Sequence, residues 1–261
     1  MSNQPVVPSD FNHHLSIDNA ADRLQEALDV AGKISEAGID LFPNMDHAAI
    51  FVDPPHLLAG PLKALGYIAG WDSRCYPSPV DEQDYINVPS GLPDGHPAAQ
   101  KGWFRYVAVV HPVDQAARDQ MLSQGYGNPF VHHLTWGIVP PDRQSKESNL
   151  DYANRLIPYA VEARNRIGAA IGEQPGTLIA ALPGDVVNDP GFDAKLDGWM
   201  EGLRADDYTV ETMQGGGFLV QFFALTGGRI EVALRVDTQQ TFNPKSVHKI
   251  SEDEISTVQN D

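Results

Sequence analysis

The segments HAAIFVDPP (residues 47–55) and HLTWGIVPP (residues 133–141) follow one pattern, and this pattern decides the fold. In each segment a histidine opens an apolar run, and a pair of prolines ends that run. Short apolar runs that stop at proline are typical of buried strands, because proline cannot donate a hydrogen bond to a neighbouring strand. A predicted helix and then strand-like sequence follow each run. We infer a repeated strand-helix-strand-strand unit, one in each half of the chain.

The segments around the two repeats have recognisable helix and strand patterns. Apolar residues at three- and four-residue spacing predict a helix over residues 17–39, ahead of the first repeat. Further on we expect strands at 45–52, 103–111, 130–139 and 177–182, helices at 56–65, 114–122 and 192–203, a long helix opened by Ser148 and Asp151, and a hairpin of residues 217–225 and 229–236. Residues 72–102 are rich in proline and glycine, and we expect a long irregular loop that serves as a lid.

Charge and composition exclude several function classes. The 261 residues carry 18 Lys and Arg against 35 Asp and Glu, a formal charge of −17, which repels nucleic acid and anionic membrane surfaces. The single cysteine, Cys75, cannot form an internal disulfide or a thiolate metal site, which favours a reducing compartment. The first residues lack a basic and apolar leader pattern, so we expect a cytoplasmic protein.

Three residues at repeated or unusual positions are candidate metal ligands. His47 and His133 open the two matching strands, and Glu231 lies within the apolar strand of the last hairpin. An isolated carboxylate is costly to bury, and a metal ion or another cation relieves that cost. Two neutral imidazoles and one carboxylate can hold a divalent metal on one side and leave the opposite positions open. The sequence therefore predicts a metal site of His47, His133 and Glu231.

Other interpretations of these residues stay open. His132 competes with His133, and alignment of the two proline pairs favours His133, which puts His132 on the opposite strand face or beside the ligand. Glu231 could instead form an ion pair with Arg229 or Arg235.

Several other polar and aromatic residues carry weaker expectations. A pocket could be lined by Arg105, Tyr106, Trp136 and Arg235, although aromatic and arginine side chains in sheets usually pack or lie at the rim. We expect His96 and His111 to be solvated, because they lie in or beside predicted loops.

With these residues the chain resembles the vicinal oxygen chelate superfamily, which includes glyoxalase-like proteins, extradiol dioxygenases and hydroxyphenylpyruvate dioxygenases. The resemblance covers about residues 45–236 and rests on His47, His133 and the Gly-Gly-Arg-Ile-Glu run that ends at Glu231. It implies paired βαβββ modules and a metal that binds substrate through two neighbouring oxygens. The chain departs from the extradiol pattern, since residues 222–228 read Phe-Phe-Ala-Leu-Thr-Gly-Gly, without the tyrosine and the Asp-Pro-x-Gly turn of those enzymes.

We therefore predict an α+β fold of paired βαβββ modules forming a cupped mixed sheet, with an extra N-terminal helix and helical insertions. The predicted parts are a helical extension (1–44), a first module (45–125), a second module with a helical insertion (126–242) and an acidic tail (243–261).

The predicted function is a mononuclear metal-dependent enzyme. The resemblance favours a non-haem Fe(II) dioxygenase acting on a small substrate with two adjacent oxygens, such as a 2-oxo acid, a 2-hydroxy acid or a catechol. The alternatives are a glyoxalase-type lyase or isomerase that uses zinc, nickel or manganese, and a metal-free small-molecule binding protein. We expect a small-molecule substrate, with O2 as co-substrate of a dioxygenase, no nucleic acid or membrane partner, and a homodimer as one option.

Overall fold

The computed structural model of the chain contains two compact units. It describes residues 17–65, 68–69, 75–77, 84–91, 106–112, 114–213, 217–225 and 229–236. Unit 1 consists of Met1–Ala27, Pro43–Thr135 and Thr241–Asp261, and unit 2 consists of Leu28–Phe42 and Trp136–Gln240. None of the helices in the described ranges has the length and apolar character needed to cross a bilayer.

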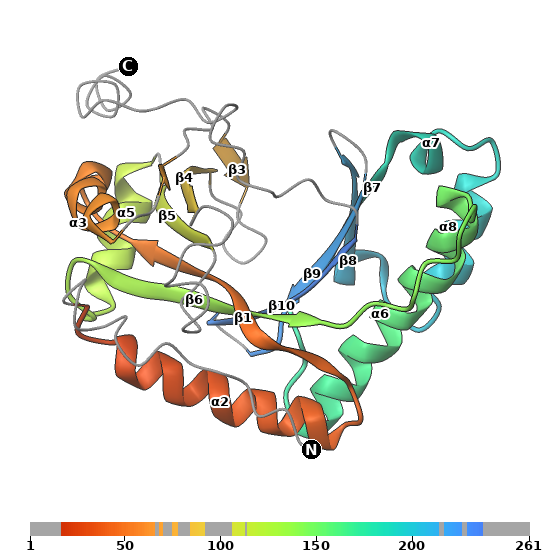
Figure 1. Ribbon diagram of the computed structural model, residues 1–261, viewed down its shortest axis with the longest axis horizontal. Coiled ribbons are helices and arrows are strands. Elements are labelled where there is room, and N and C mark those ends of the chain that lie inside the picture. The colour runs from red at the N-terminus through yellow and green to blue at the C-terminus, as the bar shows by residue number, and fades with distance from the viewer. Residues whose placement is uncertain are drawn as a thin grey trace. The chain divides into compact units, whose positions relative to one another are not determined.

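Unit 1 is built around a mixed sheet (Figure 1). Its elements are α2 (Ala20–Glu36), which starts here, β1 (Leu41–Phe51), η1 (Pro55–Leu58), α3 (Ala59–Ala64), β2 (Ile68–Ala69), β3 (Cys75–Pro77), β4 (Asp84–Gly91), β5 (Tyr106–Pro112), α5 (Gln115–Ser123) and the first part of β6 (Phe130–Ile138). The strand order is β2, β4, β5, β1. β1 runs parallel to β5, and β4 runs antiparallel to β5.

Unit 2 repeats this arrangement with different helices. Its elements, besides the ends of α2 and β6 and the start of β1, are α6 (Asn149–Ile171), β7 (Leu178–Pro183), α7 (Gly184–Val187), α8 (Phe192–Trp199), η2 (Ala205–Asp207), β8 (Tyr208–Met213), β9 (Phe218–Phe223) and β10 (Ile230–Val236). The strand order is β7, β9, β10, β6, with β8 added in parallel beyond β7.

The two units therefore share one strand order. With β3 left out of unit 1 and β8 left out of unit 2, the second, third, fourth and first strands of each unit lie side by side in that sequence, and a helix connects the first strand to the second. The α7, α8, η2 and β8 elements lie between the second and third strands of unit 2, so they are insertions into the repeat. The predicted α+β class with paired βαβββ modules and helical insertions is confirmed.

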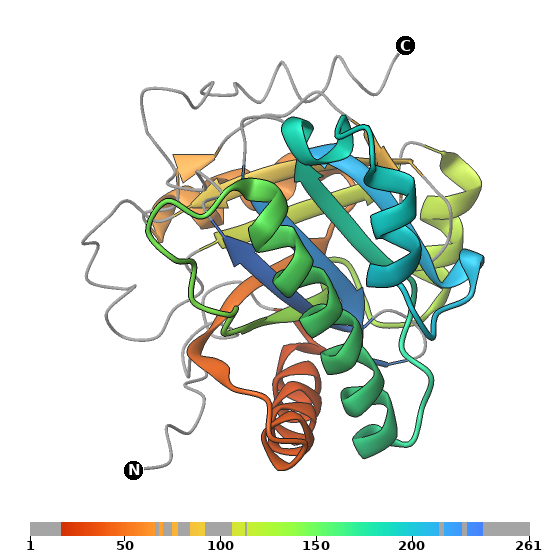
Figure 2. The ribbon, with the colours of Figure 1, turned by 90° about the vertical axis from the view of Figure 1, so that its right-hand side faces the viewer.

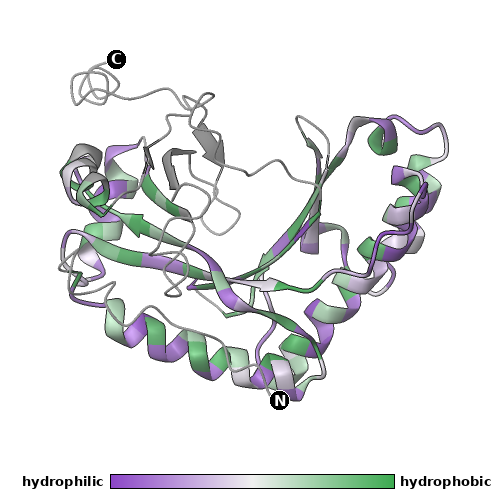
Figure 3. Ribbon diagram, in the orientation of Figure 1, coloured by the Kyte–Doolittle hydropathy of each residue, from purple (hydrophilic) through white to green (hydrophobic). Residues whose placement is uncertain are grey.

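Helix α6 covers one face of the unit 2 sheet, against β7 and β9 (Figure 2). The Ser148 hydroxyl accepts a hydrogen bond from the Asp151 backbone N–H at 3.0 Å, which caps the first turn as predicted. Hydrophobic and hydrophilic residues alternate along the helix (Figure 3), and the sheet-facing side buries Leu156, Ile157 and Ala160 completely. Gly172, in the left-handed region at φ 82°, ends the helix.

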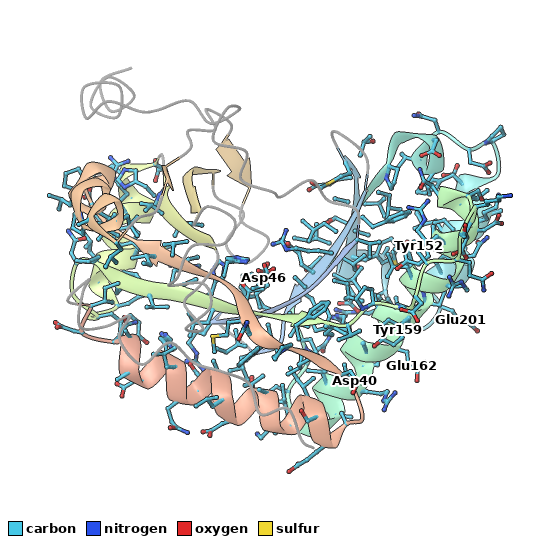
Figure 4. All side chains as sticks on the ribbon, viewed as in Figure 1. Asp40, Asp46, Tyr152, Tyr159, Glu162 and Glu201 are labelled. Carbon is cyan, nitrogen blue, oxygen red and sulfur yellow. The ribbon has the colours of Figure 1, made fainter. Side chains whose placement is uncertain are left out.

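Two tyrosines of α6 fasten the helix to the segment that follows β6. Tyr152 donates its hydroxyl hydrogen to the Pro141 carbonyl at 2.8 Å, and Tyr159 donates to the Val139 carbonyl at 3.3 Å (Figure 4). Tyr152 is fully buried, with its ring edge-on to Phe218 of β9. The proline pair that ends the second repeat is thereby held beside the helix that follows it.

The chain before α2 is tied to β6 within unit 1. Asn19 is buried, and its side-chain amide donates to the Val131 carbonyl at 3.0 Å and accepts from the Val131 N–H at 2.8 Å. The paired contacts satisfy both backbone groups of a buried strand residue. They hold in place the strand that carries His132 and His133.

Most predicted elements are present near their expected positions. The first helix, the two repeat strands, α6, β7, and the hairpin of β9 and β10 are all confirmed. The long irregular loop predicted over residues 72–102 is wrong at 84–91, which form β4 between β2 and β5. The β-forming run Tyr-Ile-Asn-Val at 85–88 outweighs the prolines around it, because both of its edges are paired. The remainder of that segment, apart from the short strand β3, lies outside the described residues.

Strand β8 was not predicted from the sequence. It pairs with β7 alone, and its side chains are half-buried or exposed. A strand without a buried face lacks the alternation of apolar and polar residues that reveals strands in a sequence.

The cap at Ser148 gives a direct test of how α6 is anchored. Replacement of Ser148 by alanine leaves the Asp151 N–H without its acceptor, so the free energy of unfolding should fall by about 1 kcal/mol. Urea unfolding followed by circular dichroism measures this change. Ser123→Ala is the matched control, since the exposed Ser123 hydroxyl donates to a carbonyl and caps no helix start. Equal effects of the two substitutions would contradict the capping role.

Candidate functional site

His47 lies near the middle of β1 in unit 1, at the start of its buried part. It is only 6% exposed, and the apolar residues that follow it, 48–52, are fully buried. Its Nδ1 lies 2.7 Å from Oδ2 of Asp46, which Figure 4 labels on β1. Its Nε2 lies 3.1 Å from the hydroxyl oxygen of Thr135 on β6. Both ring nitrogens therefore have polar neighbours inside unit 1.

His133 lies on β6, beside His47. The centres of the two rings are 5.7 Å apart, and the ring planes meet at 79°. The repeated pattern thus places its two histidines side by side within one unit. An edge-on pair at this separation leaves room for nitrogen atoms of both rings to approach a common point.

The environment of His133 keeps its imidazole neutral. Part of the residue is exposed, yet burial of the ring lowers the pKa of His133 well below its usual value, and the nearby His132 and His47 lower this pKa further. Protonation would place a charge beside two other imidazoles in a poorly solvated position. A neutral imidazole has the free lone pair that a metal requires.

His132 lies against His133 and not apart from it. Its Nδ1 is 2.8 Å from Nδ1 of His133, and the ring centres are 5.1 Å apart. The sequence left two positions open for His132, either the opposite strand face or a place beside the candidate ligand. The contact agrees with the second position.

Glu231 lies on β10 in unit 2, where it is 4% exposed. It stands opposite Phe223 in the antiparallel register with β9, and its strand neighbours Ile230 and Val232 are fully buried. A carboxylate at such a position needs a compensating partner. The structure thus confirms that Glu231 is buried among apolar residues, as the strand pattern predicted.

The remaining predicted site residues differ in their surroundings. Trp136 is fully buried on β6, which agrees with a packing role. Arg229 precedes β10, Arg235 lies within that strand near its end, and both are half-buried. Arg105 and His96 lie outside the described residues, as does the side chain of Tyr106.

The expectation that His111 is solvated is wrong. β5 extends through Pro112, so His111 lies within the strand and is 1% exposed. Its Nδ1 lies 3.1 Å from the Val52 carbonyl and 3.9 Å from Oδ1 of Asp53, and its ring stacks on Phe51. Burial lowers the pKa of His111, while the hydrogen bond to Val52 and the charge of Asp53 oppose that change. The apolar run before His111 was the signal in the sequence, because it indicates that the strand continues to this residue.

The chain has low similarity to several solved structures. No family model matches the chain. No curated protein matches it either. Among solved structures, a variant of 4-hydroxymandelate synthase from Streptomyces coelicolor matches at 18% identity and a TM-score of 0.41, over 79% of this chain and 53% of that one. A methylmalonyl-CoA epimerase from Mycobacterium tuberculosis matches at 13% identity and a TM-score of 0.34, over 75% of this chain and 89% of that one.

A third solved structure, a fusion of a xylose isomerase-like TIM barrel with a 4-hydroxyphenylpyruvate dioxygenase, matches at 13% identity and a TM-score of 0.39, over 79% of this chain and 28% of that one. The chain therefore has only a low structural similarity to each of these proteins. It spans about half the length of the hydroxymandelate synthase and less than a third of the fusion protein.

The buried His111 makes the stability of the protein depend on pH. Its folded-state pKa is depressed, so the unfolded chain binds more protons below about pH 6.5, and the free energy of unfolding falls as the pH drops through this range. His111→Asn keeps an amide that can donate to the Val52 carbonyl and removes the titration. Urea unfolding at about pH 7.5 and about pH 5.5 should show a smaller acid-induced loss for the variant. Equal losses in the two proteins would contradict this assignment.

Proposed function

We propose that the chain is a mononuclear metal-dependent enzyme in which His47, His133 and Glu231 hold one divalent ion. The observation that carries the proposal is the edge-on pair of His47 and His133 in unit 1, one of them kept neutral by burial. Glu231 supplies the buried anionic donor from unit 2. Each of the three side chains offers one donor atom, an imidazole nitrogen or a carboxylate oxygen.

The donor set fits a first-row transition metal. Imidazole nitrogens suit iron, zinc, manganese and nickel, and one carboxylate reduces the net charge without cancelling it. Three protein ligands leave coordination positions free for other molecules. Fe(II) is favoured, because two histidines and one carboxylate on one side leave room for both an organic substrate and dioxygen.

The proposed substrate is a small molecule with two adjacent oxygens, such as a 2-oxo acid, a 2-hydroxy acid or a catechol. A bound divalent ion would polarise such a substrate as a Lewis acid and stabilise negative charge on its oxygens. The low exposure of His47 and Glu231 keeps bulk water away from the donors, which strengthens electrostatic interactions there. The finer choice of a dioxygenase over a lyase or isomerase depends on which metal the protein holds.

Metal analysis tests the proposal. Protein purified without a His-tag under anaerobic conditions should contain iron in near-stoichiometric amount by elemental analysis. His133→Ala and Glu231→Ala should each lose most of this metal, because each removes one of three ligands. Glu162→Ala is a matched control, since it removes an exposed carboxylate on α6 and should keep the metal. Circular dichroism checks that every variant is folded.

The identity of the metal and the consumption of oxygen distinguish the possible reactions. Iron, together with oxygen uptake in the presence of 2-oxo acids or catechols, supports the dioxygenase. Zinc, nickel or manganese without oxygen uptake would overturn it in favour of a lyase or isomerase. Absence of metal after reconstitution with each of these ions would overturn the metal site and leave a binding protein.

A further inference from the structure

A buried arginine of α6 holds the segment of residues 173–176, which leads from that helix into β7 in unit 2. Arg164 is 3% exposed. Its Nε donates to the Gly176 carbonyl at 2.9 Å, and its Nη2 donates to the Pro175 carbonyl at 2.8 Å. Both acceptors are backbone oxygens of one short segment, so a single side chain fixes the path of the chain between the helix and the strand.

The charge of Arg164 is largely removed from water. Burial lowers the pKa of Arg164, while the charge of Asp207 opposes this change. A charged group is costly to bury, and hydrogen bonds from the guanidinium to the two carbonyl oxygens offset part of this cost. These hydrogen bonds also have a directional preference that an apolar side chain of similar size lacks. Arg164 is therefore suited to fix the position of the segment.

Two glycines allow the segment to lie close to both of its neighbours. A Cβ at Gly168 of α6 would lie 2.6 Å from Cδ of Pro175, so a larger residue there would displace the segment. On the other side, a Cβ at Gly176 would lie 3.4 Å from Cβ of Phe223 on β9. The Gly176 N–H donates to the Phe223 carbonyl at 2.8 Å. The segment is thus hydrogen-bonded both to the helix and to the strand.

Phe223 is also the residue that stands opposite Glu231 in the antiparallel register of β9 with β10. The next residue, Ala224, donates its N–H to the Ile230 carbonyl at 2.8 Å. Glu231 is the second residue of β10, and hydrogen bonds near the end of a strand open more readily than those in its middle. The hydrogen bond from Gly176 therefore supports β9 at the point that places Glu231.

We propose that Arg164 is a positioning residue, which fixes Glu231 through the segment 173–176 and Phe223. The role toward an ion rests on the proposed function, whereas the series of hydrogen bonds belongs to the metal-free protein. All of these residues belong to unit 2. A carboxylate that is already held in place loses less freedom when it binds an ion, so we expect metal affinity to depend on Arg164.

Amide hydrogen exchange in the metal-free, full-length protein tests the hydrogen bonds. Arg164→Met removes the guanidinium and keeps a long side chain, whereas Arg164→Lys keeps the charge and can still donate to a carbonyl. NMR should show that the Gly176 and Ala224 N–H groups exchange about 10-fold faster in Arg164→Met than in wild type, with a smaller change in Arg164→Lys. Unchanged exchange at Gly176 in Arg164→Met would overturn the role of Arg164.

Arg166→Met is the matched control. Arg166 also lies on α6 and donates to a backbone carbonyl, but this carbonyl belongs to Ala37, which follows α2. The substitution therefore removes a comparable contact of the same helix without affecting the segment 173–176. Exchange at Gly176 should remain as in wild type.

Co(II) binding is the readout that a purely structural role would not change. Titration against a competing chelator, with every variant shown to be folded by circular dichroism, should give a dissociation constant about 2- to 30-fold higher for Arg164→Met than for wild type. Arg164→Lys should recover part of this loss, and Arg166→Met should bind as wild type does. If Arg164→Met does not fold, Arg164→Lys gives the same test with a smaller expected change.

Two results would overturn the positioning role: equal affinity of the folded Arg164 variant and wild type, or an equal loss of affinity in Arg166→Met. If wild type binds no Co(II), the proposed function fails. The exchange rates then still decide whether Arg164 holds the segment and the end of β9 in place.

Discussion

Removal of imidazole from water is the constraint on which the rest of the candidate site depends. His47 and His133 lie at matching points of two strands whose following residues are apolar and buried, so neither ring can be fully hydrated. Burial disfavours the protonated form of His133, and the nearby His132 and His47 disfavour it further. The same packing that forms the core of unit 1 therefore keeps His133 in the neutral form that can act as a ligand.

The repeated module explains why these side chains arise at three distant points of the sequence. In each unit the first strand lies beside the fourth, so the start of a module and its end belong to one region of the sheet. His47 and His133 come from the first strands β1 and β6, and Glu231 comes from the fourth strand of unit 2. The insertions α7, α8, η2 and β8 are placed between the second and third strands, where they interrupt neither the first strand nor the fourth.

Much of the fold could be predicted from the sequence, because local residue patterns indicate where these strands and helices lie. The apolar runs that end at proline pairs predicted β1 and β6, and the Ser148 cap with its periodic apolar face predicted α6. β4 and β8 were missed, since one is interrupted by proline and the other has no buried face. The burial of His111 and the contacts of Asp46 and His132 depend on pairing and ring orientation, which no spacing rule contains. Glu231 could be recognised because a lone carboxylate in an apolar strand is costly.

We propose above all that His47, His133 and Glu231 share one ion. Anomalous diffraction from crystals of the reconstituted protein, recorded on both sides of the absorption edge of the bound metal, tests it most directly. We expect a single strong peak about 2.0 to 2.2 Å from one nitrogen of each histidine and from a Glu231 oxygen. A peak at other side chains would contradict the proposal.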